Sequence, residues 1–395
     1  MLALQIVFWL CAALIVWTQL GYALALFALD RVFAPTAALQ RERTPRSPER
    51  GGAHQDHSAH VHPLPSVSLI VAAHDEQQVI AAKVADALAL DYPRELLQVI
   101  VACDGCTDAT AARARAAGAD LVLELPRAGK IRAQDAAVDR AEGEIVAFSD
   151  ANSRWLPDAL AQLVRAFDSA DVGYACGQVR FVQDAVGAAA SNQEGIYWRY
   201  ELAVRALESR LSSITAGNGA IYATRRDAYI VVDPIMGHDL SFPFKMVKRG
   251  WRAVYVPGAL AREKMVPTTR GEFARKRRMM SHTWPIVIRG GMLSPRGYGA
   301  GYALMILSHR ILRYASPGLH TMALVTNVLL LERGPVYVVL MAGQLGVLCA
   351  AALAGVLPAR PLLVARYYVL TTASLALGLW DWLRHGTSAA WEPAE

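Results

Sequence analysis

The chain has 395 residues, of which 54% are hydrophobic and only 19% are charged. Soluble globular domains usually carry about 25% charged residues, so this composition argues against a wholly water-soluble protein and predicts membrane-embedded segments. The formal net charge of +6 does not indicate nucleic acid, because the basic residues are densest beside apolar segments, at 31–50 and 270–296, where lipid headgroups or other phosphates would meet them.

The first apolar segment, residues 3–29, is long enough to cross a bilayer, which takes about 20 residues of helix. A cleaved signal peptide is the alternative, but no basic residue precedes Arg31 and the apolar run is longer than such a peptide needs. We therefore expect a membrane helix over residues 1–30. Because Lys and Arg stay preferentially on the cytoplasmic side, the basic residues that follow predict a cytoplasmic middle region.

Residues 31–65 predict a flexible linker, because Arg, Pro, Ser, Gly and His replace large apolar side chains there. Its four histidines, at positions 54, 57, 60 and 62, leave open a metal-binding tract, although a solvated linker is the simpler interpretation. The five cysteines are scattered and indicate no disulfide framework, which agrees with a reducing compartment.

Residues 66–270 predict one cytoplasmic domain in which apolar strands alternate with helices. Strands are expected over 67–74, 97–104, 119–126, 144–150 and 251–256, and helices over 76–90, 107–117, 130–141, 194–211 and 239–249. Continuous apolar strands separated by helices indicate an α/β fold with a mostly parallel sheet and helices on both faces.

The C-terminal third predicts a return to the membrane. Residues 271–312 carry basic and aromatic side chains in the pattern of amphipathic interface helices. About three transmembrane helices are expected within 313–382, followed by a tail over 383–395. The apolar runs that predict them are 315–331, 335–357 and 362–380.

Acidic side chains follow three of the predicted strands: Asp75 and Glu76, then Asp104, then Asp150. Ligands of open α/β sheets bind outside the carboxyl ends of the strands. A single strand-end aspartate can simply cap the next helix, but acidic residues after three strands together predict a ligand site.

The ligand expected at that site is a diphosphate with a divalent cation. If Asp150 and Asn152 lie on the same side of an extended segment, they offer the oxygen ligands that Mg²⁺ or Mn²⁺ prefers. Lys130 follows Gly129 at a predicted helix start, where positive charge and free backbone N–H groups favour an anion.

Seven short motifs lie between residues 66 and 284: VAAHDE (71–76), VACDGCTD (101–108), GK (129–130), SDAN (149–152), GNGAIYATRR (217–226), GHDLSF (237–242) and RKRRM (275–279). In order, spacing and position on predicted strands they resemble the membrane-bound family 2 glycosyltransferases. The resemblance implies a GT-A nucleotide-diphospho-sugar transferase fold, and it fits the flanking membrane segments.

Carried over to this chain, the resemblance implies a donor site and a metal site. The implied donor-binding residues are Glu76, Asp104, Lys130, Asp150, Arg275 and Arg278. Asp150 and Asn152 would hold Mg²⁺ or Mn²⁺, with Asn152 in place of the second aspartate of the family's Asp-x-Asp pair. Losing that negative charge predicts a more weakly held metal.

The resemblance also implies Asp239 as the catalytic base. The implied acceptor-side residues are Tyr197, Trp198, Gly217, Asn218, Gly219 and His238. His238 stands where the family usually has an acidic residue, and Arg275 and Met279 replace the Gln and Trp of processive synthases. These departures argue against processive polymerisation and leave the transfer of single sugars intact.

Simpler interpretations of the same residues stay open. Asp239 has the alternative role of an N-cap, the arginines at 275–278 that of a lipid-headgroup anchor, and His238 that of a local hydrogen-bond partner, which we favour. The glycines at 217 and 219 suit a tight turn without any substrate contact.

The function implied is that of an inverting glycosyltransferase of envelope glycan or glycolipid synthesis, multi-pass in the cell (inner or plasma) membrane. A UDP-sugar donor and a lipid-linked or saccharide acceptor are expected, with no nucleic acid and the oligomeric state open. Two alternatives are a catalytically decayed membrane scaffold and a thiol redox protein using Cys103 and Cys106. A NAD-binding protein is excluded, because no G-x-G-x-x-G follows the first strand.

Overall fold

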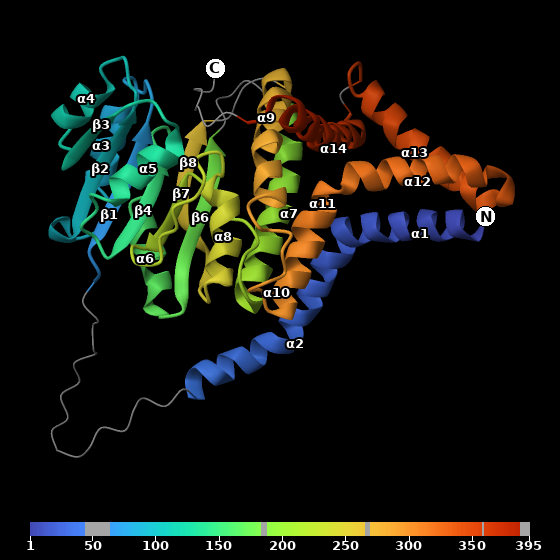
Figure 1. Ribbon diagram of the computed structural model, residues 1–395, viewed down its shortest axis with the longest axis horizontal. Helices are drawn as coiled ribbons and strands as arrows, with labels where there is room; N and C mark the ends of the chain where they lie inside the picture. The colour runs from blue at the N-terminus through green and yellow to red at the C-terminus, as the bar shows by residue number, and fades with distance from the viewer. Residues whose placement is uncertain (44–63, 183–187, 265–268, 358, 388–395) are drawn as a thin grey trace.

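The computed structural model describes residues 1–43, 64–182, 188–264, 269–357 and 359–387 (Figure 1). The linker histidines lie outside these ranges. Figure 1 shows a sheet with its covering helices on one side and a group of long apolar helices on the other. The chain enters and leaves through the apolar helices, and the sheet is built from the middle of the sequence.

Within the described residues the sheet has eight strands in the order β3-β2-β1-β4-β7-β6-β8-β5. The strands are β1 Val67–Ala73, β2 Leu97–Asp104, β3 Leu121–Leu125, β4 Ile145–Asp150, β5 Arg154–Trp155, β6 Val172–Val182, β7 Ile221–Arg225 and β8 Arg252–Lys264. The first four strands in this order are parallel, as expected, whereas β7 runs antiparallel to both β4 and β6. The sheet is therefore mixed.

Helices cover both faces of the sheet. Successive residues of a strand point to opposite faces, so the apolar strands offer side chains for packing on each face. Ile70 and Ile100 pack with α5 Lys130–Val138, α7 Ala188–Leu211 and α8 His238–Lys248 on one face. Their neighbours Leu69, Val71 and Val99 pack on the other face, in clusters that also hold residues of α3 Ile80–Leu88, α4 Thr110–Ala116 and α6 Ala159–Arg165. The core thus continues through both sides of the sheet.

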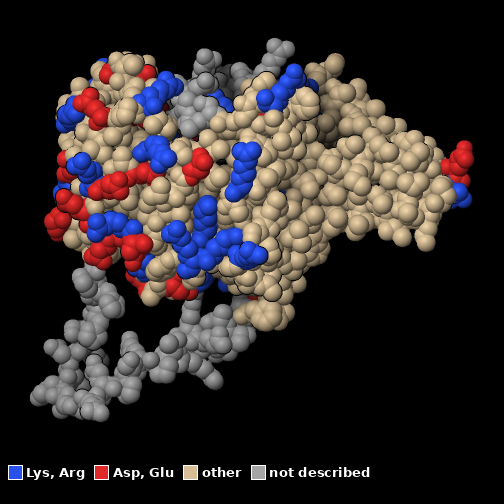
Figure 2. Space-filling model, viewed as in Figure 1, with Lys and Arg blue, Asp and Glu red and all other residues tan. Residues whose placement is uncertain are grey.

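Three helical segments among the described residues are long and apolar enough to cross a membrane: Leu2–Phe33, Pro335–Leu353 and Arg360–His385. The last two are α13 and α14. The segment expected over 315–331 is a helix as well, α12 Ser316–Leu330, but with 15 residues it is shorter than a bilayer crossing requires. In Figure 2 the part of the surface formed by these apolar helices is almost free of charged side chains.

A π-helical turn interrupts each of two long helices, and the two turns contact each other. Trp17–Gly21 separates α1 Leu2–Val16 from α2 Tyr22–Arg43, and Ile306–Ile311 separates α10 Ala300–Met305 from α11 Leu312–Tyr314. The Trp17 Nε1 donates to Ser308 Oγ and the Thr18 hydroxyl donates to the Ser308 carbonyl, both at 3.0 Å. The helix before the first turn, α1, lies alongside α12, which follows the second turn in the chain (Figure 1).

Candidate active site

A cavity of about 510 Å³ lies between the sheet and the apolar helices. Its sheet side is formed by the end of β4, the start of α5, the loop 216–220 and the start of α8. Its other side is formed by α7, α11, α14 and the helix α9 Thr269–Ile288. The cavity therefore joins the carboxyl edge of the parallel strands to the apolar part of the molecule.

Lys130 and Asp150 form an ion pair at the sheet side of this cavity. Lys130 is the first residue of α5, and Gly129 before it has a φ of 96°, which favours glycine. Both side chains are about one quarter exposed. Burial and then the negative charge of Asp150 raise the pKa of Glu76, which places Glu76 electrostatically beside this pair.

Asn152 lies differently from the predicted metal ligand. β4 ends at Asp150, and residues 151–152 form a turn, so this segment is not extended and strand alternation does not apply to it. The Asn152 side chain is exposed and does not line the cavity, whereas Asp150 does. The role of Asn152 as a metal ligand stays a prediction.

Asp104 orders the loop in front of Lys130. Its carboxylate, which is buried at the end of β2, accepts hydrogen bonds from the backbone N–H of Ala128 at 2.7 Å and of Gly129 at 3.0 Å. These bonds fix the position of the loop from which α5 begins. Contact of Asp104 with a nucleobase stays a prediction.

Asp239 lines the same cavity as Lys130 and Asp150. It is the second residue of α8, whose N-cap is Gly237 and has no side-chain capping bond, so the capping alternative for Asp239 is wrong. Among the described residues its carboxylate makes no hydrogen bond, while its carbonyl accepts one from the Gly217 N–H at 2.6 Å. The Asp239 carboxylate is therefore available to accept a proton.

His238 is buried beside Asp239 and points into an aromatic cluster. Its Nδ1 shares a 2.7 Å hydrogen bond with the Tyr222 hydroxyl, and its ring stacks on Phe242 with centroids 3.9 Å apart. Burial, followed by the positive charge of Lys130, holds the pKa of His238 well below its usual range. A neutral hydrogen-bond partner is the role that this geometry favours, and contact with an acceptor stays a prediction.

The helix α9 presents different residues to the cavity from those expected. Met279, Met280 and Thr283 line the cavity, whereas Arg278 is exposed and does not. The neighbouring Arg277 forms a two-pronged ion pair with Asp381 of α14, with N–O distances of 2.6 and 2.7 Å. The side chain of Arg275 lies outside the described residues.

The residues expected on the acceptor side, other than His238, lie on α7 and in the loop before β7. Tyr197 and Trp198 line the cavity with the three residues Gly217, Asn218 and Gly219. Sequence reasoning missed the charged residues that line it beside them, which are Glu201, Arg205, Arg310 and Arg313. Their spacing of four in 197–205 is a signal of one helix face, but nothing in the sequence shows that this face is buried.

A family model described as "Glycosyltransferase like family 2" matches residues 65–281, which is more than half of the chain. The chain belongs to this family. This match confirms the expected enzyme class, a family 2 glycosyltransferase, and favours it over the thiol redox alternative.

Curated relatives of this glycosyltransferase carry the name N-acetylglucosaminyltransferase. The proteins of Rhizobium leguminosarum bv. viciae and Rhizobium meliloti (strain 1021) are 26% identical over 231 residues and 28% identical over 233 residues. Each match covers 54% of this chain and 54% of the relative. The chain thus spans about half the length of the curated relatives it matches.

One solved structure resembles nearly the whole glycosyltransferase. The mannosyltransferase PcManGT from Pyrobaculum calidifontis, solved in complex with GDP-Man and Mn²⁺, superposes with a TM-score of 0.64 at 21% identity. The match covers 92% of this chain and 98% of the other. At this identity the likeness shows the fold, and it confirms the expected GT-A architecture with its membrane-type helices.

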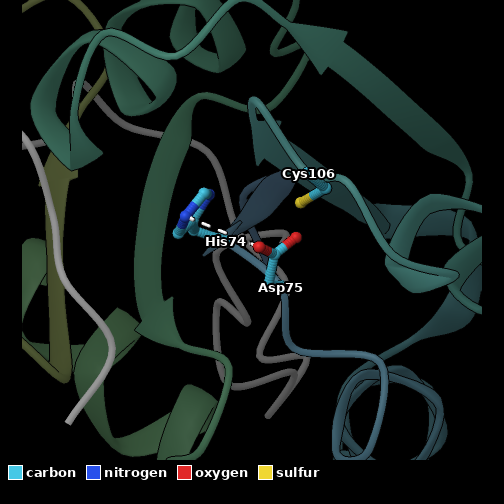
Figure 3. Close-up of side chains that lie close together, drawn as sticks. All are labelled: His74, Asp75 and Cys106. Atoms are coloured by element: carbon cyan, nitrogen blue, oxygen red, sulfur yellow. Dashed lines mark ion pairs between the residues drawn. The ribbon is translucent and has the colours of Figure 1, made fainter.

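Of the two cysteines of the C-x-x-C motif, Cys103 lies near the end of β2 and Cys106 lies in the loop that follows this strand. Burial raises the pKa of the Cys103 thiol to about 12, and burial likewise raises that of Cys106. Figure 3 shows Cys106 near His74 and Asp75, with their ligand atoms within 4.8 Å of one another. Each already has a protein partner: Cys106 contacts the Ala73 carbonyl, His74 the Asp104 carbonyl, and Asp75 accepts from Thr107.

Gly217→Ala should reduce transferase activity at least tenfold, because a Cβ at Gly217 would lie only 2.0 Å from the Tyr174 hydroxyl. Tyr174 is fully buried, so the loop would have to move, and the loop is bonded directly to Asp239. Gly219→Ala is the matched control, since its Cβ would meet only the Asp239 Cβ at 3.7 Å. Initial rates and thermal unfolding of the two variants test this, and equal activity would contradict it.

Proposed function

We propose that this glycosyltransferase moves a single sugar, with inversion, from a UDP-sugar to a hydroxyl group of a lipid-linked or saccharide acceptor at the cytoplasmic face of the cell membrane. The observation that carries the proposal is the shared cavity: Lys130, Asp150 and Asp239 line one space that is also lined by residues of the apolar helices. A donor bound at the sheet edge and an acceptor from the membrane side would meet there.

The proposed domain arrangement follows the chain. Residues 66–270 would form the cytoplasmic catalytic domain, residues 271–312 the interface region, and residues 1–30 and 313–382 the membrane part. The expected linker 31–65 and tail 383–395 begin later than predicted, because α2 continues to Arg43 and α14 to His385. The basic residues after the first span support the cytoplasmic orientation of the catalytic domain.

In the proposed reaction Asp239 takes the proton of the acceptor hydroxyl, whose oxygen forms a bond to the anomeric carbon of the sugar. The bond from that carbon to the diphosphate oxygen breaks at the same time, and the electron pair leaves with the nucleoside diphosphate. Lys130 and the N-terminus of α5 stabilise the negative charge that develops there. One displacement at one carbon inverts its configuration.

A divalent cation, Mg²⁺ or Mn²⁺, suits the residues on the sheet side. The Asp150 carboxylate faces the cavity and is partly exposed, so it offers the oxygen donors that hard cations take, and a diphosphate would supply others. When bound, such a cation would neutralise charge on the diphosphate. The PcManGT structure, a complex with GDP-Man and Mn²⁺, supports this part of the proposal.

Thermal unfolding of the purified full-length protein with nucleotide sugars, each with and without Mn²⁺, tests the donor. A ligand at 100 times its Kd stabilises the native state by about 2.7 kcal/mol, so a UDP-sugar should raise the unfolding midpoint in the presence of Mn²⁺. GDP-mannose is the comparison, since the PcManGT structure contains GDP-Man. Protection by GDP-mannose and not by any UDP-sugar would overturn the proposed nucleotide, and no protection by either would overturn the proposal.

A further inference from the structure

Three buried arginines lie at the membrane side of the cavity. Arg205, on α7, and Arg310 and Arg313, at and just after the π-helical turn before α11, are each less than one tenth exposed. Several of their buried N–H groups have no hydrogen-bond partner in the described structure: Nε and Nη1 of Arg205, Nη2 of Arg310 and Nη2 of Arg313. Buried polar groups in proteins are nearly always hydrogen-bonded, so unpaired donors on three neighbouring side chains point to a ligand.

The three arginines differ in their acidic partners. Arg313 pairs with Glu201, and the buried Glu208 lies 2.7 Å from His309 Nδ1. Glu208 also interacts electrostatically with Arg310. Among the described residues, Arg313 is therefore the one arginine of the three with a carboxylate in salt-bridge contact, while Arg310 donates to the Thr215 hydroxyl at 2.8 Å.

Arg205 makes neither a salt bridge nor a side-chain hydrogen bond among the described residues. Its contacts in the described structure are with the faces of Trp198 and Tyr255, at 6.0 and 5.7 Å from the ring centroids. Burying a charge without a counter-charge is unfavourable, so an anionic ligand would be stabilised here. Guanidinium groups match phosphate especially well, because their planar array of donors bonds two oxygens at once.

Asp239 lies within electrostatic reach of this cluster. Tyr314, which lines the same cavity, interacts with Arg310 and Arg313 and also with Asp239. Because Asp239 and the three arginines line one cavity, a single ligand bound there is able to meet both. This arrangement distinguishes the arginine cluster from the donor diphosphate site at Lys130.

A separate apolar groove lies among the membrane helices that follow the arginines in the chain. It has a volume of about 670 Å³ and lies among α12, α13 and α14, where Pro317, Leu324, Gly343 and Thr372 are among its lining residues. Pro317 is three residues beyond Tyr314 on one side, and Thr372 follows Thr371 of the first cavity on the other. The groove and the cavity share no lining residue, but α14 contributes to both, and the groove lies beside two helices that are apolar enough to span a membrane.

We propose that the acceptor is a phosphate-bearing lipid: its phosphate group binds Arg205, Arg310 and Arg313, its hydrocarbon chain lies in the groove among α12, α13 and α14, and a hydroxyl of its headgroup reaches Asp239. This inference rests on the transfer proposed above and names its acceptor class. The phosphate is held unchanged during transfer, and the headgroup oxygen gains the sugar as its proton passes to Asp239.

Thermal unfolding of the full-length protein in neutral detergent tests the recognition of both parts. The probes are a long-chain isoprenyl monophosphate, the same isoprenyl alcohol without phosphate, and inorganic phosphate. We expect the isoprenyl phosphate alone to raise the midpoint by several degrees at micromolar concentration. An equal shift with the alcohol would overturn the phosphate site, and an equal shift with inorganic phosphate would overturn the lipid part.

Arg205→Met tests the arginine cluster without breaking an ion pair. The concentration of isoprenyl phosphate for the half-maximal shift should rise roughly 10- to 100-fold, as expected for losing hydrogen bonds to a charged group. Without lipid, the variant should unfold at the same or a higher temperature, because an unpaired buried charge is gone. Arg199→Met, at an exposed position of the same helix, is the control. An unchanged lipid response in Arg205→Met would overturn the inference.

Gly343→Leu tests the groove. A side chain at Gly343 has open space, with no atom within 4 Å of its Cβ, so it should fill the groove without disturbing α13 and should weaken the lipid response at least tenfold. Gly346→Leu, equally unhindered but outside the groove, should respond like the wild type. Equal responses from the two variants would overturn the groove assignment. A wild type that is protected by a nucleotide sugar and not by isoprenyl phosphate refutes only the acceptor class, whereas one that is protected by neither UDP-sugars nor GDP-mannose refutes the proposed function.

Discussion

Replacing Asp239 with Asn should lower the rate of sugar transfer by roughly 10²- to 10⁴-fold, the usual contribution of a general base. Asn keeps the shape of the side chain and removes only its ability to take a proton. Since the carboxylate makes no hydrogen bond within the described residues, thermal stability should be unchanged. Release of nucleoside diphosphate from the donor, measured with membrane lipid present, gives the rate.

The same variant should still be protected by the donor with Mn²⁺, because the donor is expected at Lys130 and Asp150. Asp233→Asn is a suitable control, since Asp233 is an exposed aspartate in the loop before α8. If Asp239→Asn kept more than one tenth of the wild-type rate, Asp239 would not be the base. Loss of donor protection in this variant would instead place Asp239 in the donor site.

Asp150→Ala should abolish the Mn²⁺-dependent protection by a nucleotide sugar and reduce transfer to background. The substitution removes the carboxylate that faces the cavity and leaves Lys130 without its ion-pair partner. The entire ligand contribution, about 2.7 kcal/mol at 100 times the Kd, should disappear from the unfolding free energy. Midpoints with donor, with Mn²⁺ and with both separate the two ligands.

Asp91→Ala is the matched control for this second variant, because Asp91 is exposed and remote from the cavity. It should show the full wild-type shift. Protection of Asp150→Ala equal to that of the wild type would remove Asp150 from the donor site. Protection that persists but no longer depends on Mn²⁺ would keep the donor at this edge and assign only the metal to Asp150.

The central strands could be predicted closely from the sequence. β1 and β2 were expected over 67–74 and 97–104 and are found at Val67–Ala73 and Leu97–Asp104. Both are buried on two faces, so nearly every residue is apolar and the run ends where a polar residue meets the sheet edge. The same reasoning placed Asp104 and Asp150 at one edge, because parallel neighbours end on the same side.

The strands of the second half could not be predicted in the same way. β6 is interrupted by glycines and pairs with β8, about 80 residues later, with irregular register. β7 is only five residues long and is fixed by its antiparallel partners β4 and β6. Such strands depend on contacts that are distant in the chain, and local periodicity carries little information about them.

The charged residues that line the cavity could not be predicted from the sequence either, because their burial also depends on contacts that are distant in the chain. Glu201, Arg205 and Glu208 lie on a helix whose charges would ordinarily indicate a solvated face. They are buried because Arg310 and Arg313, about 100 residues later, fold back onto that helix. Burial of a charge depends on its distant partner, so composition and spacing within α7 alone do not reveal it.

The paired π-helical turns connect the first helix to the wall of the cavity, so this helix supports the site as well as anchoring the chain. Just past its own turn, the Tyr22 hydroxyl donates to Glu208 at 2.7 Å, and the Tyr200 hydroxyl reaches back to the Gln19 carbonyl at 2.9 Å. A truncated chain that starts at residue 64 would lack both contacts, and solvent would reach the side of α7 that packs behind the three arginines. Protein engineers seeking a crystallisable, detergent-free catalytic fragment should keep this helix, or supply it as a separate peptide.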